Sequence, residues 1–266
     1  LVARPRNRLG LPHCLTAAQT PQLARVPVTG VWQLLFGMAL INTVDNLGLP
    51  GAAPRHPELL DWLAADFRDS GWDLHHLIRQ IVLSATYRQD SKQRPELEDP
   101  ENRLLARGPS FRLPAETIRD QALAASGLLA REVGGPSVRP YQPDGIWEDL
   151  NAPQSHAEIY EQDSGAGLYR KSMYTYWRRA AMPPAMAVFD APSRDVCSVL
   201  RPTTNTPLQA LALLHDPTYI EAARNLAGLA LGDAQPIAGA MRRVLSRDPT
   251  GSEMGLLSDL ARARLA

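Results

Sequence analysis

Charged and amide side chains are concentrated between residues 190 and 209, and these are the residue types that acid–base chemistry uses. The set comprises Asp190, Arg194, Asp195, Arg201, Asn205 and Gln209. In an enzyme, one carboxylate of such a set can act as a base while an arginine holds an anionic group of the substrate. The competing interpretation is structural, because the same residue types pin irregular loops and satisfy their backbone groups. An enzyme needs these side chains to open together on a solvent-filled cleft, whereas a scaffold buries them in mutual pairs.

Aromatic residues are the second feature that could form a binding site. Tyr141, Trp147, Tyr176 and Trp177 lie in a proline-rich stretch without regular periodicity. Flat aromatic faces suit the faces of sugar rings, so these residues are candidates for a glycan-binding platform. The alternative is that they pack in the core or form a cover over it. A further hypothesis is that Trp147 or Tyr176 lies on a flat exposed patch that faces a neighbouring haem.

Neither a metal site nor a cofactor site is predicted in this segment. His75 and His76 are adjacent on an expected helix and point about 100° apart, so they cannot easily share an ion with His56. Cys14 and Cys197 form no Cys-x-x-Cys-His haem motif and no paired-cysteine zinc site. We expect two buried free thiols, although a disulfide between them stays open. Serine-elbow, dinucleotide and phosphate-loop motifs are also absent from the sequence, which argues against nucleotide-dependent enzymes.

The composition limits the classes of partner. The 266 residues include 28 basic and 28 acidic side chains, so the formal net charge is zero. Such a chain has no long-range attraction for nucleic acid or for an anionic membrane, and we predict neither partner. No apolar run approaches the roughly 18 residues that a membrane helix needs, so no membrane span is expected.

Helical periodicity dominates the elements that would position these residues. Apolar stripes and start or stop residues predict helices at 28–36, 57–69, 74–85, 114–133, 207–215, 217–231, 237–245 and 251–265. The second and third should form a helical hairpin, with Asp73 capping the latter. Capping-box patterns begin at Thr206 and Thr250, and Asp216-Pro217 is a third start signal.

The expected fold class is therefore mainly α, with a long irregular aromatic- and proline-rich middle segment and few or no short strands. Short strands are conceivable only at 168–178. Residues 1–22 should be irregular, and 23–266 should form a single helical domain. The polar, proline-containing stretch 88–113 is where a sub-domain boundary could fall.

Several longer motifs carry a family resemblance over about residues 23–260. They include His56-Pro57-Glu58-Leu59-Leu60-Asp61-Trp62-Leu63-Ala64, Leu83-Ser84-Ala85-Thr86-Tyr87-Arg88, Glu116-x-Ile118-Arg119-Asp120, Gly134-Gly135-Pro136-Ser137-Val138, Tyr141-Gln142-Pro143-Asp144-Gly145-Ile146-Trp147-Glu148 and the block 189–217. The sequence resembles a planctomycete-specific domain of unknown function, the C-terminal domain of exported proteins that also carry a planctomycete-type cytochrome c domain.

The resemblance implies an extracytoplasmic location, periplasmic or at the cell surface, and neighbouring domains of a longer polypeptide as partners, with a cytochrome c domain among them. It supplies no catalytic residues. The function expected from the sequence is therefore that of an extracytoplasmic accessory or interaction module of a larger cytochrome-c-containing protein. The alternative is an enzyme acting on carbohydrate or a related polymer, with the polar cluster at 190–209 as its site.

Overall fold

The fold is mainly α-helical, as predicted. The computed structural model describes residues 7–17, 20–46, 50–94, 96–146, 160–178 and 181–265. Within these ranges the chain forms ten α-helices and two 3-10 helices. The β-contacts in the same ranges are isolated bridges that pair Ala130 with Arg170, Val138 with Thr175 and Arg178 with Ala181. Residues 168–178, the stretch considered for short strands, therefore form only isolated bridges and no strand.

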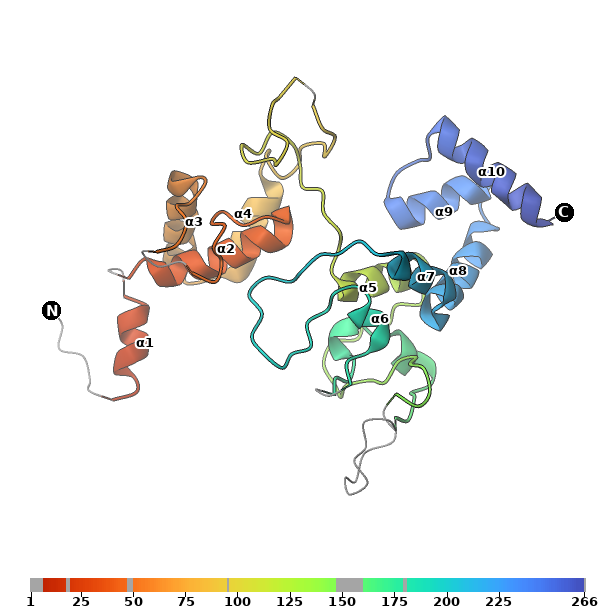
Figure 1. Cartoon of the computed structure of the whole chain (residues 1–266), viewed down its shortest axis with the longest axis horizontal. Helices are drawn as coiled ribbons and strands as arrows, with labels where there is room; N and C mark the ends of the chain where they lie inside the picture. The colour runs from red at the N-terminus through yellow and green to blue at the C-terminus, as the bar shows by residue number, and fades with distance from the viewer. Residues whose placement is uncertain are drawn as a thin grey trace. The chain divides into compact units, whose positions relative to one another are not determined.

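The chain divides into two compact units, residues 1–112 and 113–266. The first unit contains α1 (Gly10–Leu15), α2 (Gln22–Phe36), α3 (Pro57–Asp69) and α4 (Leu74–Leu83), drawn in red to light orange in Figure 1. The second contains α5 (Ala115–Ala125), α6 (Pro184–Ala187), α7 (Pro207–His215), α8 (Pro217–Ala230), α9 (Pro236–Leu245) and α10 (Gly251–Leu265). Its 3-10 helices are η1 (Gly165–Tyr169) and η2 (Ser172–Tyr174).

Helix α2 starts at Gln22 rather than at the expected residue 28, because its apolar stripe extends further towards the N-terminus. Ala24, Val28 and Trp32 are spaced four residues apart and are all buried. The helix ends at the predicted residue, Gly37, which adopts the left-handed conformation with φ of 75°. Helix α1 lies in the stretch that was expected to be irregular, and its described residues bury no side chain.

Helices α3 and α4 form the predicted hairpin, and both pack on α2. The core between them includes Leu60 and Leu63 from α3 and Leu77 and Ile81 from α4. Asp73 caps α4 as predicted, since its Oδ1 accepts hydrogen bonds from the N–H groups of His75 at 2.8 Å and His76 at 3.1 Å. Local capping and an apolar stripe therefore fix this half of the first unit.

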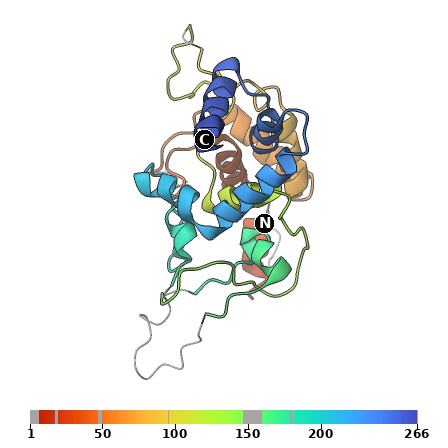
Figure 2. The same ribbon diagram turned by 90° about the vertical axis from the view of Figure 1, so that its right-hand side faces the viewer.

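The second unit is built around α5 and α8, which pack against each other, with α9 also in contact with both. Leu123 is fully buried, and a core cluster includes Ala115, Met186, Phe189 and Tyr219. In Figure 2 the long irregular runs of this unit are seen beside its helices. The helix start signals at Thr206, Asp216 and Thr250 were all predicted correctly.

Helix α5 ends at Ala125, about two turns before the predicted stop at Gly134-Gly135. The stop is Gly127, which has φ of 75°. The N–H of Leu128 donates back to the carbonyl oxygen of Leu123 at 2.9 Å, which closes the helix end. The prediction placed the end at the double glycine because Leu129 was assigned to the buried face of the helix.

Buried Arg119 holds the first part of the irregular middle segment. Its guanidinium donates to the carbonyl oxygens of Leu168 at 2.6 Å and Arg170 at 2.9 Å, and to Ser172 Oγ at 3.2 Å. The neighbouring Asp120 accepts the N–H of Ser172 at 2.8 Å. Burial lowers the pKa of the Arg119 guanidinium below its ordinary value. One helical turn of α5 thus supplies the hydrogen bonds that a sheet would otherwise give to this backbone.

Arg170 is also buried, and it holds the segment around Gly134. Its guanidinium donates to the carbonyl oxygens of Pro136 at 3.0 Å and of Gly134. The same guanidinium lies over the Tyr174 ring, 4.0 Å from the ring centre. The irregular backbone is therefore tied together by arginine side chains.

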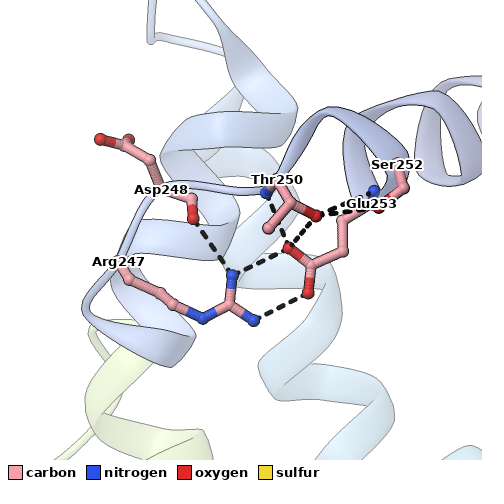
Figure 3. A network of polar contacts seen from close by, with 5 residues as sticks. All are labelled: Arg247, Asp248, Thr250, Ser252 and Glu253. Atoms are coloured by element: carbon pink, nitrogen blue, oxygen red, sulfur yellow. Dashed lines mark hydrogen bonds and ion pairs between the residues drawn. The ribbon is translucent and has the colours of Figure 1, made fainter. Parts of the chain in front are cut away.

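The start of α10 is a complete capping box, shown in Figure 3. The N–H of Thr250 donates to Glu253 Oε2 at 2.8 Å, and the N–H of Glu253 donates to Thr250 Oγ1 at 3.3 Å. Arg247 adds a bidentate pair, because its two terminal nitrogens donate to the two Glu253 oxygens at 2.7 and 2.8 Å.

Cys14 and Cys197 are free thiols, and both are exposed. The expectation that they would be buried was wrong. Cys14 lies on α1, a helix too short to bury a face, and Cys197 lies in the exposed stretch 194–208.

Candidate functional site

Two of the polar residues predicted between 190 and 209 share a partner, and the arginines of this stretch contact other elements. Asp190 accepts hydrogen bonds from the N–H of Thr204 at 2.7 Å and from Thr204 Oγ1 at 2.8 Å. Gln209 is buried, and its Nε2 donates to the carbonyl oxygen of Val188 at 3.0 Å and to Thr204 Oγ1 at 3.1 Å. Asp190 and Gln209 therefore meet on Thr204 and close the loop that leads into α7.

The arginines of this stretch contact other elements. Arg201 donates to Glu116 Oε2 at 2.8 Å and so joins the loop to the first turn of α5. Arg194 lies over the Trp177 ring, 4.1 Å from the ring centre. Asp195 and Asn205 are exposed. The contacts described for Asp190, Gln209 and Arg201 are those of a pinned loop, in which polar groups hold the backbone.

The predicted aromatic residues that the structure describes make different contacts. Trp147 lies outside the described residues. Arg139 covers the Tyr176 ring at 5.0 Å from its centre, and Trp177 donates from Nε1 to the carbonyl oxygen of Ser193 at 3.1 Å. Tyr141, by contrast, lines a groove, and the candidate site is built from this residue.

The groove runs along α8 beside the C-terminal end of α5 and has a volume of about 1000 Å³. The lining residues that belong to α8 recur every three or four positions, so one face of this helix lines the groove. The lining residues are Ser126, Gly127, Leu128, Tyr141, Pro217, Ile220, Glu221, Arg224, Asn225, Gly228 and Leu229. Helix α8 thus presents apolar, charged and amide side chains to one open space.

Glu221 is the carboxylate of the groove, and tyrosine hydroxyls bind both of its oxygens. Tyr141 Oη donates to Glu221 Oε2 at 3.0 Å, and Tyr169 Oη donates to Oε1 at 2.7 Å. Burial is the main cause that raises the pKa of Tyr141 above its ordinary value, and the hydrogen bond to Glu221 is the next largest cause. The hydrogen bond to Glu221 is the main reason that the pKa of Tyr169 is raised strongly.

Sequence reasoning identified Tyr141 but missed Glu221 and Tyr169. The face of α8 that lines the groove follows a helical pattern, which could have marked that face as a surface of interest. The pairing itself has no local signal, since Tyr141 and Glu221 are 80 residues apart and Tyr169 and Glu221 are 52 apart.

Neither phenol of the groove has a pKa shifted towards neutrality. At neutral pH both phenols keep their protons, because their pKa values are raised away from neutrality. A general acid or base works best with a pKa near the working pH, so the shifts go in the unfavourable direction for catalysis. Among the residues that the structure describes, no group of three or more His, Cys, Asp or Glu could hold a metal ion.

Comparison with known families places both units in one domain type. The sequence matches the model of the family described as "Protein of unknown function (DUF1553)" over residues 7–261. The chain belongs to this family. The DUF1553 match spans the helical hairpin of the first unit and the groove of the second. No curated protein and no solved structure shows significant similarity to the chain.

Two of the motifs that carried the family resemblance, 116–120 and 134–138, hold the irregular segments of this DUF1553 chain in place. Glu116, Arg119 and Asp120 on α5 bind Arg201 and the 168–172 segment, and Gly134 and Pro136 supply the carbonyls that Arg170 holds. In the described part of the chain, no helix combines the length and the apolar character needed to cross a membrane.

Proposed function

We propose that this chain is an extracytoplasmic accessory module of a larger cytochrome-c-containing protein, and that it binds its ligand without converting it. The location and the neighbouring cytochrome c domain are supported by the sequence resemblance. The observation that carries the binding role is the Tyr141–Glu221–Tyr169 arrangement. Both oxygens of Glu221 already accept a phenol hydrogen bond, so these three side chains form a fixed polar wall, and the exposed Arg224 and Asn225 line the same groove.

The competing function, an enzyme with its site at 190–209, has less support. Asp190 is bound by Thr204, and Arg201 is bound by Glu116. An enzyme would have to break these contacts to use either group. The two residues also stabilise the loop before α7, so their release would loosen the helix start.

A glycan is the ligand class that we propose for the groove. Ile220 and Leu229 are about half exposed and offer an apolar surface to the face of a sugar ring. Arg224 and Asn225 are exposed on the same helix and can donate to hydroxyl groups. This combination of an apolar floor and polar edges is typical of small-ligand sites.

The binding role can be tested with a panel of soluble polysaccharides. Affinity electrophoresis measures binding, and a reducing-end assay on the same mixtures measures cleavage. We expect retardation by at least one polysaccharide with no growth of reducing ends. Ile220→Ala should weaken the retardation, whereas Leu231→Ala, which removes an exposed leucine at the end of the same helix, should not. Reducing ends that accumulate with the wild type, but not with Asp190→Asn, would establish the enzyme instead.

The setting can be tested in native cells. An antibody to this chain should detect a band larger than the 29.2 kDa of these residues in the periplasmic or surface fraction. The same band should stain for covalently bound haem. A cytoplasmic band, or a band of the right size without haem staining, would contradict the proposed location or the proposed cytochrome c neighbour, respectively.

A further inference from the structure

A second groove lies in the first unit, between α3 and α4. Its volume is about 540 Å³. The lining residues are Trp32, Leu59, Trp62, Leu63, His76, Arg79, Gln80, Ile81, Leu83, Ser84, Thr86 and Leu105. His76, Arg79, Gln80 and Leu83 follow the spacing of a single helical face, so α4 forms one wall. The groove is separate from the site of the proposed function.

The accessible surface of this groove is mainly apolar. The Trp62 side chain on α3 is 55% exposed, and Leu83 on α4 is 59% exposed. Large hydrophobic residues placed at the rim of a concave surface are typical of protein-binding sites. Below them Leu63 and Ile81 are buried in the core, which makes the floor rigid.

Most of the polar groups in or beside the groove are already engaged. The Nε2 of His76 and the Oδ2 of Asp66 are hydrogen-bonded at 2.8 Å. Gln80 Nε2 lies 3.2 Å from the same His76 nitrogen and 3.5 Å from the same Asp66 oxygen. A sugar needs several free donors and acceptors around each ring, and these three side chains serve one another. The groove therefore suits an apolar side chain better than a pyranose.

Arg79 is the charged group that stays open to a ligand. It is exposed, and no carboxylate within the described residues forms an ion pair with it. Arginine binds carboxylates in a bidentate manner, so an acidic residue next to the apolar anchor would complement this wall. The position of Arg79 one turn from both His76 and Leu83 places the charge at the edge of the apolar surface.

We propose that the α3–α4 groove binds an amphipathic helical peptide segment of a partner protein, with two large apolar side chains over Trp62 and Leu83 and an acidic residue on Arg79. Helix-in-groove recognition uses this combination, in which anchors three or four residues apart enter an apolar channel and a flanking charge sets the orientation. The partner is thus a segment with leucine or phenylalanine anchors and a neighbouring Asp or Glu.

The proposal is tested by selection of a phage-displayed random 15-residue library on the whole chain. We expect the enriched peptides to share two large apolar residues three or four positions apart and an acidic residue at a fixed offset. Trp62→Ala should lower the affinity for a synthetic copy of the best peptide by about tenfold or more, as expected for a central aromatic anchor. Leu104→Ala, an exposed leucine of the same unit outside the groove, should leave binding unchanged.

A charge reversal separates the specific mode from general stickiness. Arg79→Glu should weaken binding of the acidic peptide. A peptide with Lys in place of the acidic residue should bind this variant again. Arg88→Glu, a charge reversal on an exposed arginine outside the groove, should have no such effect. Both changed side chains are exposed, so thermal unfolding should show that each variant is folded.

Several outcomes would overturn the proposal. One is that selection on the wild-type chain enriches peptides no more than selection on Trp62→Ala does. Another is that the enriched peptides show no preference for an acidic residue. A third is binding of a glycan, and of no peptide, that depends on Trp62. None of these results bears on the groove at Tyr141, whose variants are different.

Discussion

The guanidinium of Arg170 lies 4.0 Å from the centre of the Tyr174 ring, and the hydroxyl of the same tyrosine accepts the N–H of Gly134 at 2.7 Å. Arg170 in turn donates to the carbonyl oxygen of Gly134. Both polar groups of one glycine are therefore held by a single stacked pair. This pair fixes the turn that follows Val133 without any strand.

Arg170 should be among the most sensitive positions of the second unit. Arg170→Ala removes a buried guanidinium together with its hydrogen bonds to the carbonyl oxygens of Gly134 and Pro136, and we expect a loss of about 2–3 kcal/mol in the free energy of unfolding. Tyr174→Phe removes one hydrogen bond and should cost about 1 kcal/mol. Chemical denaturation measures both, with the exposed Arg131→Ala as control. Equal, small effects of Arg170→Ala and Arg131→Ala would contradict this role.

Gly30, inside α2, and Gly37, at its C-terminal end, should respond in opposite directions to replacement by alanine. At Gly37 φ is 75°, and a Cβ would lie 2.5 Å from Cδ1 of Phe111, whereas a Cβ at Gly30 meets nothing within 4 Å. Gly37→Ala should therefore destabilise the first unit by about 1–3 kcal/mol, through backbone strain and overpacking. Gly30→Ala should stabilise it by about 0.5–1 kcal/mol, because glycine weakens a helix interior. Thermal unfolding of the two variants should shift in opposite directions, and shifts of the same sign would refute the assignment.

The capping box of α10 should respond to acid. Hydrogen bonds from Arg247, followed by those from Thr250, lower the pKa of Glu253 to about 2 from an ordinary value of 4.5. Because the folded-state pKa is depressed, the stabilisation is complete above pH 4.5 and is lost as the pH falls towards 2. The ¹³Cδ resonance of Glu253 should titrate near the lower value, and Arg247→Gln should raise its midpoint. A midpoint near 4.5 in the wild type would show that the contacts are not maintained in solution.

The tyrosines of the α8 groove should differ in their response to loss of the carboxylate. The hydrogen bond to Glu221 is the main cause of the raised pKa of Tyr169, whereas burial is the main cause for Tyr141. Glu221→Gln should therefore lower the pKa of Tyr169 more than that of Tyr141, as followed by ¹³Cζ resonances. These raised values stabilise the fold below pH 10, and this contribution disappears as the pH rises through the folded-state pKa values. Equal shifts of both phenols would contradict the arrangement.

Features that depend on neighbours in the sequence were predicted well. The Asp73 cap and the Thr250–Glu253 box lie within one helical turn, so residue types at fixed offsets identify them. The hairpin of α3 and α4 follows from two apolar stripes and a short turn. The end of α5 was missed because Leu129 was assigned to its buried face, whereas the left-handed Gly127 ends the helix earlier.

Features that depend on distant residues were beyond the sequence. Arg119 reaches carbonyls 49 and 51 residues away, and nothing in its own neighbourhood marks those partners. The same holds for the Glu221 carboxylate, which meets Tyr141 only after the fold is formed. The polar run at 190–209 was recognised as notable, but composition could not tell a pinned loop from a reactive cluster.

The irregular middle segment is held mainly by main-chain atoms. Arg119 and Arg170 bind the carbonyl oxygens of Leu168, Gly134 and Pro136, and every amino acid carries such a carbonyl. At these points the path of the segment thus depends on Arg119 of α5 and on one side chain of its own, Arg170. The side chains at the bound carbonyls can therefore change, and with them whatever they recognise, while the path of the chain is preserved.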